Sequence, residues 1–388
     1  MKDRQKTKDN HFVPQFYLKQ FLNKNGCLYC YDSINKKNFS CTNIKEVCKK
    51  KNLYLIKNKI SILDKCIFIK FMKNLDSVDK DFCDLLVEML NDTTGNLFSI
   101  KIKGNKKIEE EINTLRQKSL NNNDYSRKQE TLFCYIEDNF QSLYAKIIEN
   151  ENIDNTNKEN ENLKMYLYAK VLRFIHQELF NDLKNIIESE NKEKSKNLLK
   201  LNLLNNTKEN IPLFDIMYYM LTQYFRTQKV FNEIKEALNT HEEKMQLFIN
   251  KEFPNEKFDI NNLIFLFINI KPILLLNSMF NYKFHLLLLK NNTYTPFLTS
   301  DNPCINTYAD SNKKKNNKKY TFDELELYFP LTPTLALLLT KNQNISKEIE
   351  DVRVIKEYNL KIIKNAERYV FANYDKLLEI YIGNFFTH

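Results

Sequence analysis

The stretch FLTSDNPCI, residues 297–305, is an apolar, strand-like run that stops abruptly at four polar residues and a proline. Asp and Asn before Pro favour a turn, so this stretch predicts a strand end. A second stretch, HFVPQFYL at residues 11–18, lies near the other end of the chain. We expect the two to approach each other, because a short N-terminal hairpin cannot bury its apolar face alone.

The composition indicates a folded protein rich in helices. The chain has 388 residues, of which 43% are hydrophobic, and this is enough for a sizeable core. It contains only four Gly and eight Pro. So few residues that interrupt helices argue against a sandwich of tight turns and favour long helices.

The net charge of +10 permits a polyanionic partner such as a nucleic acid or a nucleotide. The abundance of Lys and Asn is also typical of an AT-rich genome, so the charge alone does not assign one. The chain start lacks the apolar core of a signal peptide, and no segment has the roughly 18 uninterrupted apolar residues of a membrane span. We therefore expect a soluble, cytoplasmic protein with no membrane contact and with free thiols at its eight Cys.

Hydrophobic spacing divides a single domain, residues 1–388, into three regions. Residues 11–56 predict a short helix and a β-hairpin, and residues 77–237 have the three- and four-residue spacing of helices. Residues 255–388 have mixed α/β character. In that region, Phe284–Leu289, Pro296–Thr299, Leu327–Phe329, Ala336–Thr340 and Arg368–Ala372 predict strands, and Asp351–Ala366 predicts a helix.

These patterns predict an α+β fold. It should be predominantly helical, with an N-terminal helix-hairpin and a small C-terminal antiparallel sheet packed together. That packing would bring His11 toward Asp301.

Several segments resemble a bacterial family catalogued as a domain of unknown function, number 4238. They are HFVPQFYL at residues 11–18, QYFRT at 223–227, FLTSDNP at 297–303 and FPLTP at 329–333, followed by Asn359, Ala366, Arg368, Tyr369 and Val370. Gln228 departs from the pattern, since the family's proline is expected there. The resemblance implies no activity, but it implies that these dispersed polar residues converge.

Asp301 is the first candidate for a catalytic role. Together with Ser300 and Asn302, it offers a carboxylate and polar groups at a strand end, where small-molecule and phosphate chemistry often occurs. The structural alternative is that these side chains bond to nearby backbone amides in a turn.

His11 is the second candidate, as a general acid or base at neutral pH. If Pro14 opens a helix, the free N–H groups of the first turn would favour an anion beside His11 and Gln15. Alternatively, His11 caps the helix or packs on Phe12.

Arg226 is the third candidate, because its spacing from Gln223 and Thr227 places all three on one helix face. It could bind a phosphate, or it could form a buried pair with Asp301. Asn359 and Arg368 are weaker binding candidates of the same type.

Other kinds of site have little support in the sequence. Cys27, Cys30, Cys41 and Cys48 have the count of a four-thiolate zinc site, but the first pair lies in a predicted strand with side chains on opposite faces. We therefore predict no metal site there. No glycine-rich phosphate loop, serine-hydrolase motif or dinucleotide fingerprint is present, and no cofactor is indicated.

Two functional hypotheses follow. The first is a phosphodiesterase-like or nuclease-like intracellular enzyme acting on nucleic acid or a nucleotide. In it His11 is general acid or base, Arg226 contacts phosphate, and Asp301 orients the histidine or ligates a metal. The second is a non-enzymatic binding or effector module in which the same residues are structural. The sequence indicates no protein partner and leaves both hypotheses open.

Overall fold

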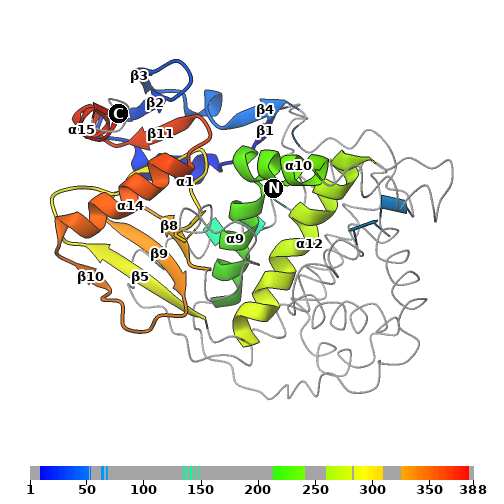
Figure 1. Ribbon diagram of the computed structural model, residues 1–388. Helices are drawn as coiled ribbons and strands as arrows, with labels where there is room; N and C mark the ends of the chain where they lie inside the picture. Colours follow the sequence, from blue (N-terminus) through cyan, green and yellow to red (C-terminus); the bar gives the residue numbers. More distant parts are fainter. Residues whose placement is uncertain are drawn as a thin grey trace, which may run out of the picture.

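The computed structural model describes residues 9–51, 53, 63–64, 67–68, 133, 136–137, 140–141, 144, 147, 213–240, 259–281, 284–308 and 325–383. Within these ranges the chain forms six α-helices and three β-sheets. Figure 1 shows the helices α9, α10 and α12 on one side of the molecule and most of the strands on the other.

A four-stranded sheet joins the two ends of the chain. Strands β2 (Leu28–Asp32) and β3 (Lys37–Cys41) form an antiparallel hairpin. The late strand β11 (Tyr369–Ala372) pairs with β2 on one side and with β6 (Thr299–Ser300) on the other. The N-terminal hairpin therefore buries itself against the C-terminal part of the chain.

The five-stranded sheet has the order β10-β5-β9-β8-β7. Only β10 runs parallel to its neighbour β5. The strands are β5 (His285–Asn291), β7 (Ile305–Asn306), β8 (Leu327–Pro330), β9 (Leu335–Thr340) and β10 (Glu348–Ile349).

Both faces of this five-stranded sheet are buried, and its side chains alternate between two hydrophobic cores. Leu337 and Leu339 of β9 belong to one core, and Leu338 belongs to the other. The first core contains side chains of α9 (Leu213–Phe225) and α12 (Ile260–Asn281). The second contains side chains of α14 (Val352–Asn365) and α15 (Asp375–Gly383).

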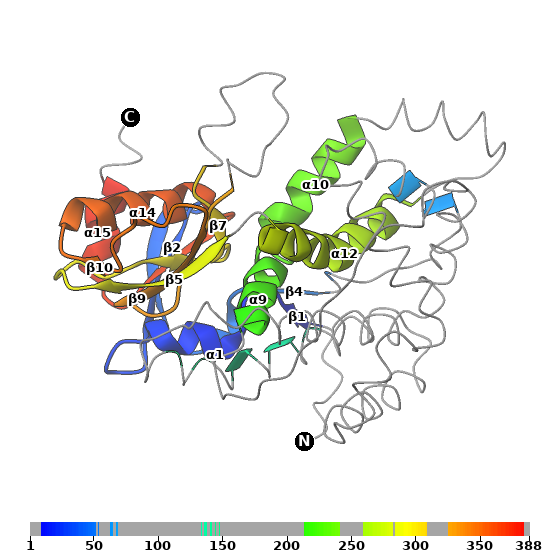
Figure 2. The same cartoon turned by 90° about the horizontal axis from the view of Figure 1, so that it is seen from below.

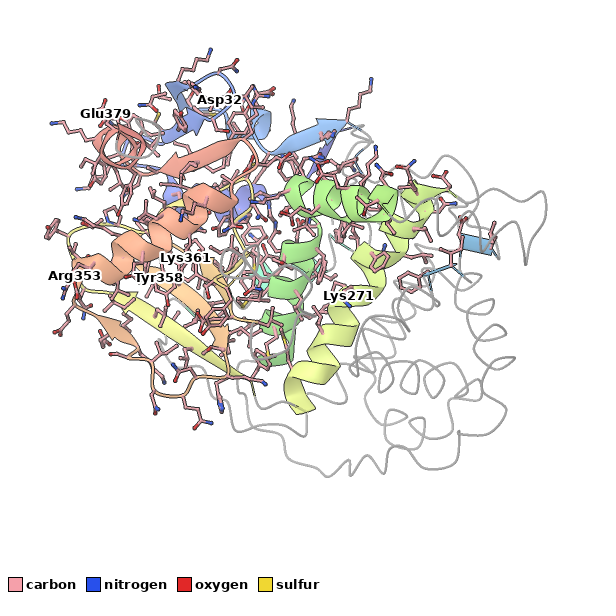
Figure 3. All side chains as sticks on the ribbon, in the orientation of Figure 1. Asp32, Lys271, Arg353, Tyr358, Lys361 and Glu379 are labelled. Carbon is pink, nitrogen blue, oxygen red and sulfur yellow. The ribbon has the colours of Figure 1, made fainter. Side chains whose placement is uncertain are left out.

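Figure 2 shows these helix pairs on opposite sides of the strands. Helix α10 (Gln228–Thr240) follows α9 after a two-residue turn. On α14, the Tyr358 ring stacks on Tyr328 of β8 with 4.3 Å between centroids, and Lys361 lies 5.9 Å from the Tyr358 centroid (Figure 3).

The third sheet is a two-stranded ribbon near the N-terminus. Strand β1 (Asp9–His11) pairs with β4 (Lys49–Lys51), and between them lie α1 (Gln15–Leu18) and two single-turn helices, η1 (Lys19–Phe21) and η2 (Ile44–Glu46). Tyr17 and Phe21 of this region are fully buried.

The predicted fold class is wrong. The described residues are not predominantly helical with an N-terminal helix-hairpin, because the N-terminal region consists mainly of strands and its helix α1 has only four residues. The hairpin is half of a sheet completed by β6 and β11, and a separate sheet lies beside it. The spacing of hydrophobic residues predicts individual strands. It does not predict which strands pair, because β2 and β11 are more than 300 residues apart in the sequence. Most of the predicted helical region, residues 77–212, lies outside the described residues apart from a few positions.

Candidate functional site

The ribbon of β1 and β4 places His11 directly opposite Lys49. Opposite residues of an antiparallel pair lie on the same face, so the imidazole and the Lys49 side chain share one side of the ribbon. Lys49 Nζ also lies 2.9 Å from Glu46 Oε2. Lys50 and Lys51 are exposed. We call this β1 and β4 pair, with Lys49, Lys50 and Lys51, the basic ribbon.

His11 is half-buried, and its Nε2 lies 3.0 Å from Nε2 of Gln15. This contact suits a neutral imidazole in which Nε2 accepts the amide hydrogen. Pro14 precedes α1 as its N-cap residue, as expected for a helix start, but the helix is too short to supply the strong N-terminal dipole that an anion site would use. His11 and Gln15 therefore contact each other, but the length of α1 gives the anion site predicted at the helix start little support.

Arg226 joins the N-terminal segment to the end of α9. Its Nη2 donates to the carbonyl oxygen of His11 at 2.5 Å, and its Nη1 lies 2.5 Å from Oε1 of Glu137. Its guanidinium carbon lies 4.5 Å from the centroid of the Phe133 ring. Arg226 is thus buried in an ion pair with Glu137, whereas the pair considered from the sequence was one with Asp301.

Gln223 makes a parallel connection from the last turn of α9. Its Nε2 donates to the carbonyl oxygen of Phe12 at 2.7 Å, and Gln223 is 1% exposed. Helix α9 ends at Phe225, so Arg226 and Thr227 lie in the turn before α10 and not on the predicted helix face.

Asp301 uses its carboxylate to hold a backbone segment of the C-terminal region. Oδ1 accepts from the Glu367 N–H at 2.9 Å, and Oδ2 accepts from the Arg368 and Tyr369 N–H groups at 2.8 and 2.9 Å. Burial raises the pKa of Asp301 to about 6, because lost hydration outweighs the three N–H donors. The carboxylate of Asp301 is therefore occupied by backbone N–H groups of residues 367–369.

Ser300 and Asn302 form the turn that carries Asp301. Ser300 Oγ donates to the carbonyl oxygen of Asn302 at 2.9 Å, and the Asn302 N–H donates back to Oγ. Thr227 Oγ1 donates to Asn302 Oδ1 at 2.9 Å, and Asn302 Nδ2 donates to the Asn365 carbonyl at 3.0 Å. The turn thus connects the α9 to α10 junction with the end of α14.

Asn359 and Arg368 also have structural partners. Asn359 accepts from the Leu298 N–H at 2.8 Å and donates to the carbonyl of Pro296 at 2.9 Å. Arg368 donates to both carboxylate oxygens of Asp32, at 2.8 Å for its shortest contact. These bonds, with those from Asn35, hold the pKa of Asp32 well below its usual range.

Sequence reasoning missed Glu137, the ion-pair partner of Arg226. Glu137 follows Ile136 in a helical stripe that was predicted for its apolar residues. One acidic residue among many on the polar side of such a stripe carries no local signal, because its partner lies 89 positions away.

The cysteines of the N-terminal region are free thiols. Cys30, Cys41 and Cys48 are buried, and burial raises the pKa of each thiol. Across the described ranges, no three His, Cys, Asp or Glu side chains are grouped so that they could hold a metal ion. The helices that the structure describes include none long and apolar enough to cross a bilayer.

Comparison with known proteins places this chain in a family. A family model described as "Protein of unknown function (DUF4238)" matches residues 9–376. The chain belongs to this family, which confirms the resemblance found in its sequence. No curated protein and no solved structure matches the chain.

Proposed function

We propose that this chain is a binding or effector module that contacts a polyanion, in particular single-stranded nucleic acid, through the basic ribbon. The observation that carries this proposal is the exposure of adjacent lysines on β4, beside the half-buried His11 on β1. Exposed lysines neutralise phosphates and release counterions, which is the main source of affinity for nucleic acids, and at the edge of a narrow ribbon a flexible strand can contact lysines on both faces.

The surroundings of the ribbon are also basic. Residues 9–51 contain eight Lys and only three acidic residues. Two of the three acidic side chains are engaged, Asp32 by Arg368 and Glu46 by Lys49. Lys36, Lys37 and Lys45 are exposed in the same region, so its positive charge faces solvent.

The contacts of the predicted catalytic residues Asp301 and Arg226 support a structural role for these two residues within the module. The Asp301 carboxylate is 3% exposed and accepts three backbone N–H groups, and Arg226 is 3% exposed and paired with Glu137. A phosphate group would have to displace these partners, leaving a buried charge or buried donors unsatisfied at a cost of several kcal/mol.

Binding of a fluorescent single-stranded oligonucleotide tests the proposal. In the variant K50A/K51A, we expect the slope of log affinity against log salt to become shallower by about 1.4, the value for two lost phosphate contacts. The matched control, K347A/K356A, removes two exposed lysines near β10 and α14 and should keep the wild-type slope. Equal losses in both variants, or no binding by the wild type, would overturn the proposal.

A phosphodiesterase-like reaction at His11 is a second candidate. Two observations favour it. His11 is half-buried opposite Lys49, and the carbonyl oxygen of His11 accepts a hydrogen bond from Arg226, which is paired with Glu137. Here the imidazole acts as general base after Gln15 releases Nε2. The H11A variant should then bind the oligonucleotide like the wild type but not cleave it. An intact oligonucleotide after incubation with the wild type removes this candidate and leaves the binding proposal standing.

A further inference from the structure

We infer that Arg226 and Glu137 are positioning residues that fix the orientation of the basic ribbon on helix α9. The inference concerns the geometry of the ribbon, and its consequence for polyanion binding rests on the function proposed above.

Two side chains at the end of α9 hold two successive carbonyl groups of the N-terminal segment. Arg226 Nη2 donates to the oxygen of His11, and Gln223 Nε2 donates to the oxygen of Phe12. The Phe12 N–H donates to the Cys48 carbonyl at 3.0 Å, immediately before β4. The end of β1 and the start of β4 are therefore held together at Phe12.

Glu137 lies beside Arg226 and pairs with it in this position. The Arg226 side chain is 4% exposed, and its charge is balanced by Glu137, whose side chain is 17% exposed. A buried guanidinium without its carboxylate costs several kcal/mol, so loss of Glu137 should release Arg226 from this position. Lysine cannot replace Arg226. The two Nη atoms of the guanidinium group point at the His11 carbonyl oxygen and at Glu137 Oε1, and a single ammonium group cannot reproduce this geometry.

The ribbon depends on these contacts because it is small. It has three residue pairs, and within the described part of the chain it forms a sheet of its own, joined to no other strand. An isolated two-stranded ribbon is at best marginally stable in water. The ribbon therefore keeps one orientation relative to the rest of the fold only while α9 holds the adjoining backbone.

Amide hydrogen exchange tests the inference without assuming a ligand. In R226K and E137Q, we expect exchange of residues 10–13 and 48–51 to rise at least about tenfold, while strands β5 and β9 keep wild-type protection. R353K is the matched control, because Arg353 pairs with Asp351 at the surface of α14, at the edge of the molecule in Figure 3. It should change exchange at neither place.

Two results would overturn the inference, and a third would overturn only the proposed function. Unchanged exchange in the ribbon of R226K and E137Q shows that the pair does not position it. A rise of equal size in β5 and β9 shows that the pair stabilises the whole fold and does not specifically position the ribbon. If ribbon exchange rises but oligonucleotide affinity stays the same in R226K and in K50A/K51A, the positioning role holds and the ribbon is not the binding surface.

Discussion

At the scale of single residues, two fully buried tyrosines have opposite hydrogen-bonding environments. Tyr17 Oη donates to the Pro330 carbonyl at 2.7 Å and lies 2.6 Å from Thr299 Oγ1, so it links α1 to both large sheets. Tyr219 Oη is buried on α9 with no hydrogen-bond partner among the described residues. A bonded hydroxyl stabilises the folded state, whereas an unbonded buried hydroxyl costs free energy.

Removing each hydroxyl should therefore have opposite effects. We expect Tyr17→Phe to lower the free energy of unfolding by about 1 to 3 kcal/mol, because it leaves the Pro330 carbonyl without its donor. Tyr219→Phe should leave it unchanged or raise it by up to about 1 kcal/mol. Urea denaturation of the two variants measures both values, and an equal loss in both would show that Tyr219 Oη is bonded in solution.

Asp301 should make stability depend on pH in an unusual direction. Its folded pKa is about 6, above the value of about 3.9 for an unfolded Asp. Between these values the folded state binds the proton more strongly, so the contribution of Asp301 to stability is fully present below about pH 4 and is lost as pH rises through 6.

The comparison with Asp301→Asn isolates this contribution. The free energy of unfolding of the wild type minus that of the variant should rise by about 2 kcal/mol as pH falls from 7 to 4, somewhat less than the full two pKa units because an unfolded Asp is only half protonated at pH 4. Denaturation curves at several pH values measure it. A difference that falls as pH is lowered would mean that the three N–H donors outweigh burial.

At the scale of elements, the junction of α9 and α10 explains why Gln228 fits where the family resemblance led us to expect proline. Gln228 is the first residue of α10, and a first helical residue has no intrahelical partner for its N–H group. Proline is well suited to this position, and Thr227 before it is a common N-cap residue. The chain breaks its helix here without proline, and Thr227 is fixed by its bond to Asn302.

Gln228→Pro should therefore be tolerated. We expect it to raise the free energy of unfolding by about 0.4 to 1 kcal/mol relative to Gln228→Ala, because proline restricts the unfolded chain. Alanine is the proper reference, since both substitutions remove the bond from Gln228 Nε2 to Asn232. Thermal denaturation checks the difference, and a lower midpoint for the proline variant would show that the backbone of Thr227 or Gln228 cannot adopt the required conformation.

At the scale of the whole molecule, the two ends of the chain build one structure. Strand β11 pairs with β2 across an interval of more than 300 residues, and the Asp301 turn holds the start of β11 by the backbone of residues 367–369. The polar residues of the family segments join parts of the chain that are distant in the sequence, and most of them bind backbone groups. This arrangement favours the binding or effector module over the enzyme that the same residues suggested.

The sequence by itself determined the apolar elements and the family. The strands predicted near β5, β8, β9 and β11, and the helix near α14, are present, because side-chain alternation and helical spacing are properties of neighbouring residues. It also indicated that residues 301–303 form a turn and that His11 lies close to Gln15.

Only the tertiary structure decided which groups meet. In the folded chain Arg226 pairs with Glu137, and the Asp301 carboxylate accepts hydrogen bonds from the backbone of residues 367–369. The N-terminal hairpin forms one sheet with β11. The physical reason is that a buried charge or carbonyl group needs a hydrogen-bond partner within about 3 Å, and packing decides which group lies there. That partner is chosen by contacts between distant segments, which the local pattern of residues does not encode.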